Sequence, residues 1–184
     1  MRVIAGTAGG LRLKTRNSED TKPTLDRVKE AMFSMLAPYL NEAAVLDLFA
    51  GSGALGIEAL SRGAKSCAFS DRNKMCCDII QQNLTHTGLS GKASLLSMEF
   101  TGALKLLAEQ SGQFDLVLLD PPYNKGFEQQ AMELLAKYGL CAQGALVAVE
   151  RAASVRLPQT VGPFTLLKEK KYGTVGLSIY EKKV

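Results

Sequence analysis

Short apolar runs alternate with stretches of helical periodicity from residue 44 onward, which predicts a mostly parallel, doubly wound α/β sheet. The most apolar run, residues 114–119, is typical of a strand buried on both faces. Two last runs flank Lys171-Tyr172-Gly173 and predict a C-terminal antiparallel hairpin, which makes seven strands in all. The expected strands are residues 44–48, 66–70, 93–96, 114–119, 144–150, 164–170 and 174–180, and the expected helices are residues 54–61, 74–84, 101–110 and 127–138.

A separate element precedes this sheet. Apolar runs at residues 2–4 and 11–13 flank the glycine-rich residues 6–10 and predict a small β-hairpin. Apolar residues then recur at helical spacing, and Thr24 or Asp26 is expected to cap that helix. We expect one domain over residues 1–184, with an N-terminal extension (1–40) and a core (41–184).

Composition narrows the function classes. Four cysteines without C-x-x-C spacing and the single histidine, His86, disfavour a metal site and disulfides, which fits a reducing cytoplasm. His86 precedes Thr87-Gly88 and is expected to be a solvated residue at a helix end. No apolar stretch approaches the ~20 residues of a membrane span, and residues 1–6 lack the apolar core of a signal peptide.

The net charge of +4 is mild, but basic residues gather at the two ends of the chain. Such ends suit a face that contacts phosphates, and strand edges protected by lysine would look the same. The basic residues are Arg2, Arg12, Lys14 and Arg16 at one end and Lys168, Lys170, Lys171, Lys182 and Lys183 at the other.

A glycine-rich loop follows the first expected strand. Gly51, Gly53 and Gly56 satisfy the G-x-G-x-x-G pattern, and Asp71 lies 20 residues after Gly51, where an acid would bind a ribose. On this pattern alone, an NAD-binding enzyme is a reasonable interpretation. Asp47 argues against it, because a carboxylate at the end of the first strand would repel a pyrophosphate.

S-adenosylmethionine is a cationic ligand without phosphates, and it fits the acidic residues better. Asp47, Asp71 and Glu99 follow three successive strands, and ligands of this fold bind outside the carboxyl ends of the strands. Asp71 is expected to accept hydrogen bonds from both ribose hydroxyls, and Glu99 or its backbone to meet the adenine amine.

The segment Asp120-Pro121-Pro122-Tyr123 comes directly after the expected strand 114–119. Proline donates no ladder hydrogen bond, so the chain must leave the sheet at a rigid corner. The Asp120 carboxylate and the Pro121 carbonyl are two acceptors that match the two hydrogens of an exocyclic amine, and Tyr123 can stack on a base.

With these residues in hand, the chain resembles the class I S-adenosylmethionine-dependent methyltransferases, whose fold is Rossmann-like. More closely, it resembles the RsmD family of bacteria, which methylates the exocyclic N2 of a guanine in 16S ribosomal RNA. The resemblance rests on residues 2–6, 22–33, 45–64, 120–123 and 171–173. It implies a cytoplasmic RNA-binding enzyme, expected to be a monomer, that acts on 16S ribosomal RNA, free or in an assembling small subunit.

The site residues expected from motif and resemblance form three sets. For catalysis they are Asp120, Pro121, Pro122 and Tyr123; for S-adenosylmethionine Asp47, Phe49, Ala50, Gly51, Ser52, Gly53, Asp71, Arg72, Glu99, Phe100 and Asp120; and for RNA Arg2, Thr24, Asp26, Arg27 and Tyr123. For Arg27, an intramolecular salt bridge is an equal alternative.

Other functions stay open at this point. A DNA adenine or cytosine amino-methyltransferase or a protein glutamine methyltransferase can use the same corner, although 184 residues leave little room for a separate DNA-recognition domain. In a different class, a dinucleotide-dependent oxidoreductase or a non-catalytic nucleotide-binding module would also need the glycine loop.

Overall fold

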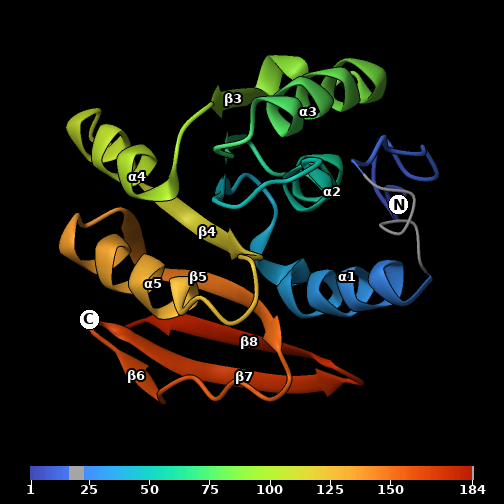
Figure 1. Cartoon of the computed structure of the whole chain (residues 1–184). Coiled ribbons are helices and arrows are strands. Elements are labelled where there is room, and N and C mark those ends of the chain that lie inside the picture. The colour runs from blue at the N-terminus through green and yellow to red at the C-terminus, as the bar shows by residue number, and fades with distance from the viewer. Residues whose placement is uncertain (17–22, 184) are drawn as a thin grey trace.

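A computed structural model describes residues 1–16 and 23–183, with backbone alone for residues 23–25. One eight-stranded sheet, in the order β3-β2-β1-β4-β5-β8-β7-β6, runs through the molecule (Figure 1). β1 to β5 are parallel neighbours, which confirms the predicted doubly wound sheet. These strands are β1 (Ala44–Asp47), β2 (Ser66–Ser70), β3 (Ala93–Leu96), β4 (Phe114–Leu119) and β5 (Cys141–Ala152).

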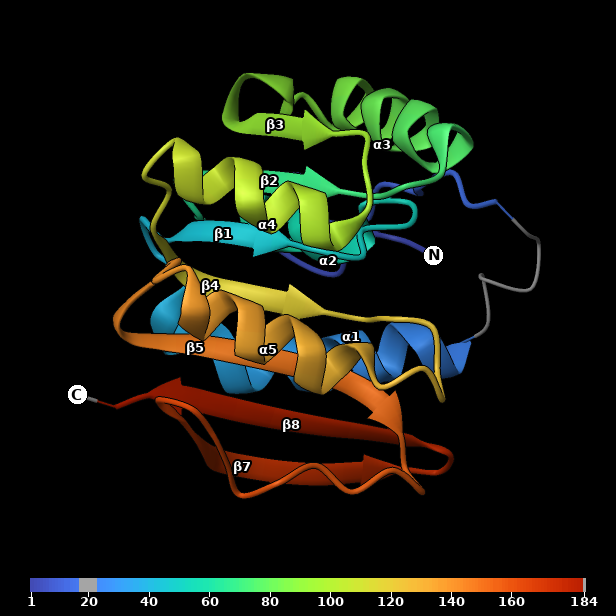
Figure 2. The ribbon, with the colours of Figure 1, turned by 60° about the vertical axis from the view of Figure 1, so that its left-hand side comes forward.

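Helices cover both faces of the sheet, and each face has its own apolar core (Figure 2). The first three helices pack on one face, and the last two pack on the other. None of the helices in the described part of the chain is long and apolar enough to cross a membrane. The helices are α1 (Pro23–Leu36), α2 (Ala54–Ser61), α3 (Lys74–Thr87), α4 (Phe100–Glu109) and α5 (Phe127–Lys137), with short 3₁₀ turns η2 (Ala37–Tyr39) and η3 (Ser90–Lys92).

The C-terminal strands extend the sheet in the antiparallel sense. β8 (Val175–Lys182) pairs with both β5 and β7 (Phe164–Tyr172), which confirms the predicted hairpin. The prediction of seven strands was wrong by one, because β6 (Thr160–Val161) adds an eighth at the edge. Two residues are too short to leave an alternating pattern in a sequence.

The N-terminal segment is held against α2 by a buried carboxylate, Glu58. Its oxygens accept hydrogen bonds from the backbone N–H groups of Ile4 (2.8 Å) and Ala5 (3.1 Å). They also pair with the side chains of Lys29 (3.2 Å) and Arg62 (2.7 Å). Lys29 is as buried as Glu58, and that burial lowers the pKa of its ammonium group although Glu58 opposes the shift. The buried charge of Lys29 in the extension and that of Glu58 in the core therefore stabilise each other.

The predicted N-terminal hairpin forms as a single antiparallel bridge between Arg2 and Arg12, flanked by turn hydrogen bonds. The predicted cap of the following helix was wrong, because α1 begins at Pro23 and therefore already contains Thr24 and Asp26. Proline suits the first helical position, where its missing N–H has no partner to lose. His86 is exposed in the last turn of α3, as predicted.

We predict that Glu58→Ala lowers the free energy of unfolding by about 3–5 kcal/mol, because it leaves the buried Lys29 ammonium with the Arg2 carbonyl but without its carboxylate partner. Urea unfolding measures the change. The double variant Lys29→Met/Glu58→Leu removes both charges and should recover much of the loss, and Glu109→Ala, at an exposed position, should change stability by less than about 0.5 kcal/mol. A single variant as stable as the wild type would show that the pair is not needed to hold the extension.

Candidate functional site

A cavity of about 530 Å³ opens at the carboxyl ends of the parallel strands. The chain leaves β1 for α2 on one face of the sheet and leaves β4 for α5 on the other face. Neighbouring strands whose connections diverge in this way leave a crevice between them, and ligands of such folds bind there. The loop after β1 and the corner after β4 both line the cavity.

The carboxylate of Asp71 holds the glycine loop in place through hydrogen bonds. The backbone N–H of Gly51 donates to Asp71 Oδ2 at 2.9 Å, and that of Asn73 donates to Oδ1 at 2.8 Å. Gly51 adopts a φ of +57°, a conformation that favours glycine, and it lines the cavity. Gly56 serves packing instead, because a Cβ there would come within 2.3 Å of the Phe69 ring.

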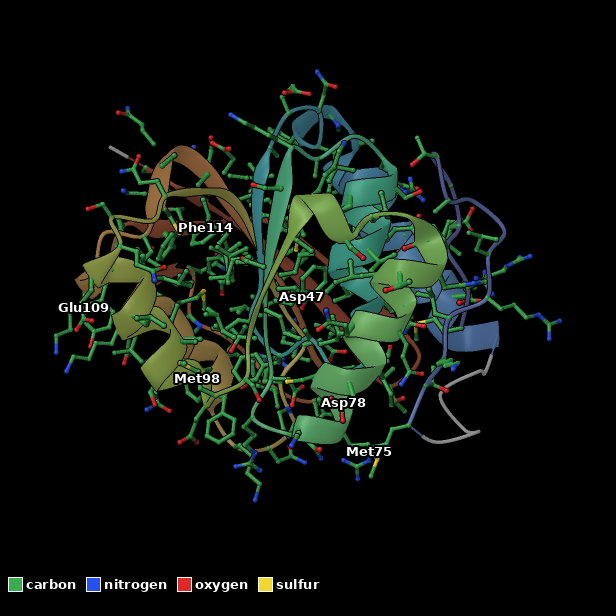
Figure 3. The ribbon with its side chains drawn as sticks, turned by 90° about the horizontal axis from the view of Figure 1, so that it is seen from above. Asp47, Met75, Asp78, Met98, Glu109 and Phe114 are labelled. Carbon is green, nitrogen blue, oxygen red and sulfur yellow. The ribbon has the colours of Figure 1, made fainter. Side chains whose placement is uncertain are left out.

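Asp47 does not line the cavity, so its expected direct contact with a ligand is not what the structure shows. It lies in the interior near α2, only 1% exposed, where its Oδ2 accepts from the Gly56 N–H at 2.9 Å (Figure 3). Its Oδ1 has no hydrogen-bond partner among the described residues. Burial raises the pKa of Asp47 to about 7. The residue therefore supports the glycine loop from behind and places a titratable group beneath the site.

Three phenylalanine rings form an apolar wall of the cavity. Phe49 and Phe127 stack with an interplanar angle of 4° and centroids 6.2 Å apart. Phe100 packs against both, with centroids at 5.0 and 5.2 Å. Phe49 comes from the loop after β1, and the other two rings stand at the beginnings of α4 and α5. A wall of this kind suits the flat face of an aromatic ligand.

The corner after β4 presents its carboxylate to the cavity. Asp120 is exposed, and it lines the cavity. Burial of the carboxyl group, together with the charges of Glu150 and Asp47, raises the pKa of Asp120 well above its usual range. The corner thus carries a carboxyl group of unusual basicity.

Glu150, in β5, is the acidic neighbour of that corner. It is 8% exposed, and its Oε1 accepts a hydrogen bond from the Tyr123 hydroxyl at 3.2 Å. Burial raises the pKa of Glu150, and burial followed by the charge of Glu150 raises the pKa of Tyr123. Glu150 was not predicted as a site residue, although it ends the expected strand 144–150 and so carries the same signal as the other acids at strand ends; in the structure β5 continues to Ala152.

The structure brings most of the predicted site residues together. Of those expected to bind S-adenosylmethionine, Asp47 and Gly53 are not in the cavity wall, and the other nine are. The four residues of the corner are all in the wall. Residues of the wall that sequence reasoning missed are Met1, Lys29, Leu48, Ala54, Leu55, Met98, Phe127 and Glu150.

The residues expected to contact RNA lie mainly beside the cavity. Arg2 is exposed, with its Nε 3.7 Å from Asp26 Oδ2, and Arg27 is exposed as well. Tyr123 is the one member of this set in the cavity wall, and the side chain of Thr24 lies outside the described residues. The extension does reach the cavity, through Met1 and Lys29.

Comparison with known proteins places this geometry among methyltransferases. Residues 1–181 match the model of a family described as Conserved hypothetical protein 95. A relative in Haemophilus influenzae, named Ribosomal RNA small subunit methyltransferase D, is 40% identical, with 98% of this chain and 93% of that protein covered.

Solved structures agree. A candidate methyltransferase of Escherichia coli, yhhF, is 32% identical with a TM-score of 0.87, and the match covers 100% of this chain and 98% of that one. An RNA methyltransferase of Salinibacter ruber, solved in complex with S-adenosyl-L-homocysteine, has a TM-score of 0.66 at 14% identity. The match covers 88% of this chain and 94% of that one, and it shows a shared fold.

Proposed function

We propose that this chain methylates the exocyclic N2 of a guanine in 16S ribosomal RNA, with S-adenosylmethionine as the methyl donor. The chain belongs to the family described as Conserved hypothetical protein 95, together with Ribosomal RNA small subunit methyltransferase D. One observation carries the proposal: the Asp120 corner and the glycine loop with Asp71 open into the same cavity. A methyl donor and an amine held by these two elements would meet there.

The charges around the cavity favour this donor over a dinucleotide. The wall contains four carboxylates, from Asp71, Glu99, Asp120 and Glu150, against two basic side chains, from Lys29 and Arg72. An acidic cavity attracts a cation and repels a pyrophosphate. We expect Asp71 and the Gly51 loop to hold the ribose and the phenylalanine wall to contact the adenine. S-adenosylmethionine supplies an electrophilic methyl group, and the protein supplies orientation and electrostatics.

The amine of guanine is a poor nucleophile, because its lone pair is delocalised into the ring. Asp120 and the Pro121 carbonyl can accept hydrogen bonds from the two N2 hydrogens and so orient the amine with its lone pair toward the methyl group. The same acceptors stabilise the positive charge that develops on nitrogen as the N–C bond forms. The nitrogen must then lose a proton, and the raised pKa of Asp120 suits its carboxylate to accept it.

Tyr123 is expected to stack on the target base, which is worth ~1–3 kcal/mol per base. Its hydrogen bond to Glu150 fixes the ring at the cavity wall before the base arrives. A base paired in a helix cannot reach this wall, so the target guanine must be unpaired or flipped out.

The basic ends of the chain support an RNA partner. The β7–β8 turn and the N-terminus both lie at the side of the sheet where the parallel strands end (Figure 2). Exposed Lys170 and Lys171 stand in β7 near that turn, and exposed Arg12 stands in the N-terminal segment. Lys182 and Lys183 contribute less than predicted, because the first donates to the Cys141 carbonyl and the second pairs with Glu181. Phosphates on both sides of the cavity would meet positive charge.

The remaining parts of the proposal concern context. We propose that the protein acts as a monomer in the cytoplasm, on 16S ribosomal RNA that is free or part of an assembling small subunit. The free cysteines Cys67, Cys76, Cys77 and Cys141 are all buried, which suits a reducing compartment.

We predict that Asp71→Ala weakens binding of S-adenosylhomocysteine at least about tenfold, because it removes charged hydrogen bonds to the ribose and to the Gly51 loop. Titration calorimetry measures the affinity. Asp78→Ala, on the exposed side of α3, is the matched control and should bind as the wild type does (Figure 3). Equal affinity of Asp71→Ala and the control would rule out Asp71 as a donor-binding residue.

We predict that Asp120→Ala reduces methyl transfer to 16S ribosomal RNA by about a hundredfold or more, because it removes an acceptor aimed at charge that develops in the reaction. Transfer of labelled methyl groups under single-turnover conditions measures the rate. Affinity for S-adenosylhomocysteine should stay within a few-fold of the wild type. Near-normal turnover by Asp120→Ala would refute the role of the corner, whereas a wild type that transfers no methyl group to 16S ribosomal RNA would refute the proposed function.

We predict an acid limb in the pH profile of methyl transfer, since Asp120 must be ionised to accept hydrogen bonds and a proton. The raised pKa of Asp120 places this limb above the usual aspartate range. Glu150→Gln keeps an acceptor for Tyr123 but removes the charge that raises this pKa, so the limb should move to lower pH. Burial, the largest cause, and the charge of Asp47 also raise the pKa of Asp120, so part of the shift should persist. The exposed control Glu109→Gln should leave the limb in place, and an unmoved limb in Glu150→Gln would contradict the coupling.

A further inference from the structure

A second cavity, of about 360 Å³, lies beside the first one. It is formed between the beginning of α5 and the segment that follows β5. Its wall includes Asn124, Gly126, Glu128, Gln129, Arg156 and Leu157. None of these residues belongs to the set that the proposed reaction uses.

Residues 123–128, from the corner after β4 to the first residues of α5, contribute to the walls of both cavities. Tyr123 and Phe127 line the first cavity, and Asn124, Gly126 and Glu128 line the second. Consecutive Cα atoms are only 3.8 Å apart, so a single thickness of chain separates the two spaces. The charge of Glu128 contributes to the raised pKa of the Tyr123 hydroxyl, which agrees with this proximity.

Glu128 is a buried carboxylate without a hydrogen-bond partner at one oxygen. It is 2% exposed, and its Oε1 has no partner in the described part of the chain. A buried carboxylate is costly unless hydrogen bonds satisfy it, and native proteins leave few such groups unsatisfied. Its position in the first turn of α5 is favourable to a negative charge. A donor from outside the protein would complete it.

We propose that this second cavity binds the nucleobase next to the target guanine in the RNA, with Glu128 accepting hydrogen bonds from its amino or ring N–H groups. The inference rests on the proposed function. The side chains of this wall suit a nucleobase. A carboxylate can accept hydrogen bonds from amino groups, and the amides of Asn124 and Gln129 offer both donors and acceptors. The exposed Arg156 on the opposite side can contact the adjoining phosphate or stack on the base.

A metal ion fits this cavity less well than a base. Only two carboxylates line it, from Glu128 and Glu133, and Glu133 already accepts a hydrogen bond from Gln129 Nε2 at 2.8 Å. Over residues 1–16 and 23–183, no group of three or more His, Cys, Asp or Glu side chains could hold a metal ion. Adjacency to Tyr123 favours a neighbouring nucleotide, because the flanking base of a strand whose target base stacks on Tyr123 must lie close by.

Methylation of RNA fragments with each of the four bases at each flanking position tests the proposal. The fragments carry the guanine that the wild type methylates. We expect the wild type to prefer one base at one flanking position by roughly tenfold or more in kcat/KM, within the range of a good bidentate contact. Glu128→Gln should reduce that preference at least severalfold, mainly through KM, and leave affinity for S-adenosylhomocysteine unchanged.

Two further variants keep the test decisive. Arg156→Ala changes the opposite, exposed wall and should raise KM for the preferred fragment with little change in kcat, even where Glu128→Gln folds poorly. Glu109→Gln, at the far end of α4, is the matched control and should keep the wild-type preference (Figure 3). A wild type that methylates its fragments without flanking preference, or a preference unaltered in Glu128→Gln and Arg156→Ala, would overturn the inference. Should the wild type methylate no fragment, the same flanking changes are tested in 16S ribosomal RNA assembled into small subunits, and failure there as well would refute the proposed function.

Discussion

The crevice between β1 and β4 is the constraint on which the rest of the site depends. These strands are neighbours in the sheet, yet their connections leave to opposite faces, so no backbone fills the space above their ends. The loop after β1 and the corner after β4 therefore face each other across it. The N-terminal extension, pinned by Glu58 to α2, closes one side and brings Met1 and Lys29 to the cavity. The topology of the chain thus creates the crevice, and the side chains that line it define its chemistry.

The carboxyl groups in and behind this crevice then determine which ligands and which reaction it favours. The charges of Glu150 and Asp47 both act on Asp120, and burial raises the pKa of all three carboxyl groups. Such a concentration of carboxyl groups is costly in a protein that binds nothing, because burial disfavours the charged form. A cationic donor and an amine that becomes positive during the reaction both relieve this cost. The same acids that weigh against a dinucleotide therefore favour methyl transfer to nitrogen.

Local patterns revealed seven of the eight strands, most helix boundaries, the glycine loop and the Asp120 corner, because each is encoded in consecutive residues. The features that these patterns missed depend on contacts between residues that are far apart in the sequence. Glu150 lies in an apolar strand and bonds to Tyr123, which is 27 positions away in the sequence. Lys29 looks from the sequence like a residue on the polar side of a helix, but in the structure it is buried beside Glu58. Asp47 was expected at the surface of the site and lies behind it, since strand-end position does not reveal on which side of a loop a carboxylate ends.

The central claim is that the crevice joins a methyl donor to a guanine amine of 16S ribosomal RNA. Mass mapping of 16S ribosomal RNA from cells with and without the protein tests this most directly, with an Asp120→Ala strain as a third sample. The account predicts one guanine that carries an N2-methyl group only where the intact protein is present. Identical guanine methylation in all three samples, or a protein-dependent methyl group on another base, would contradict it.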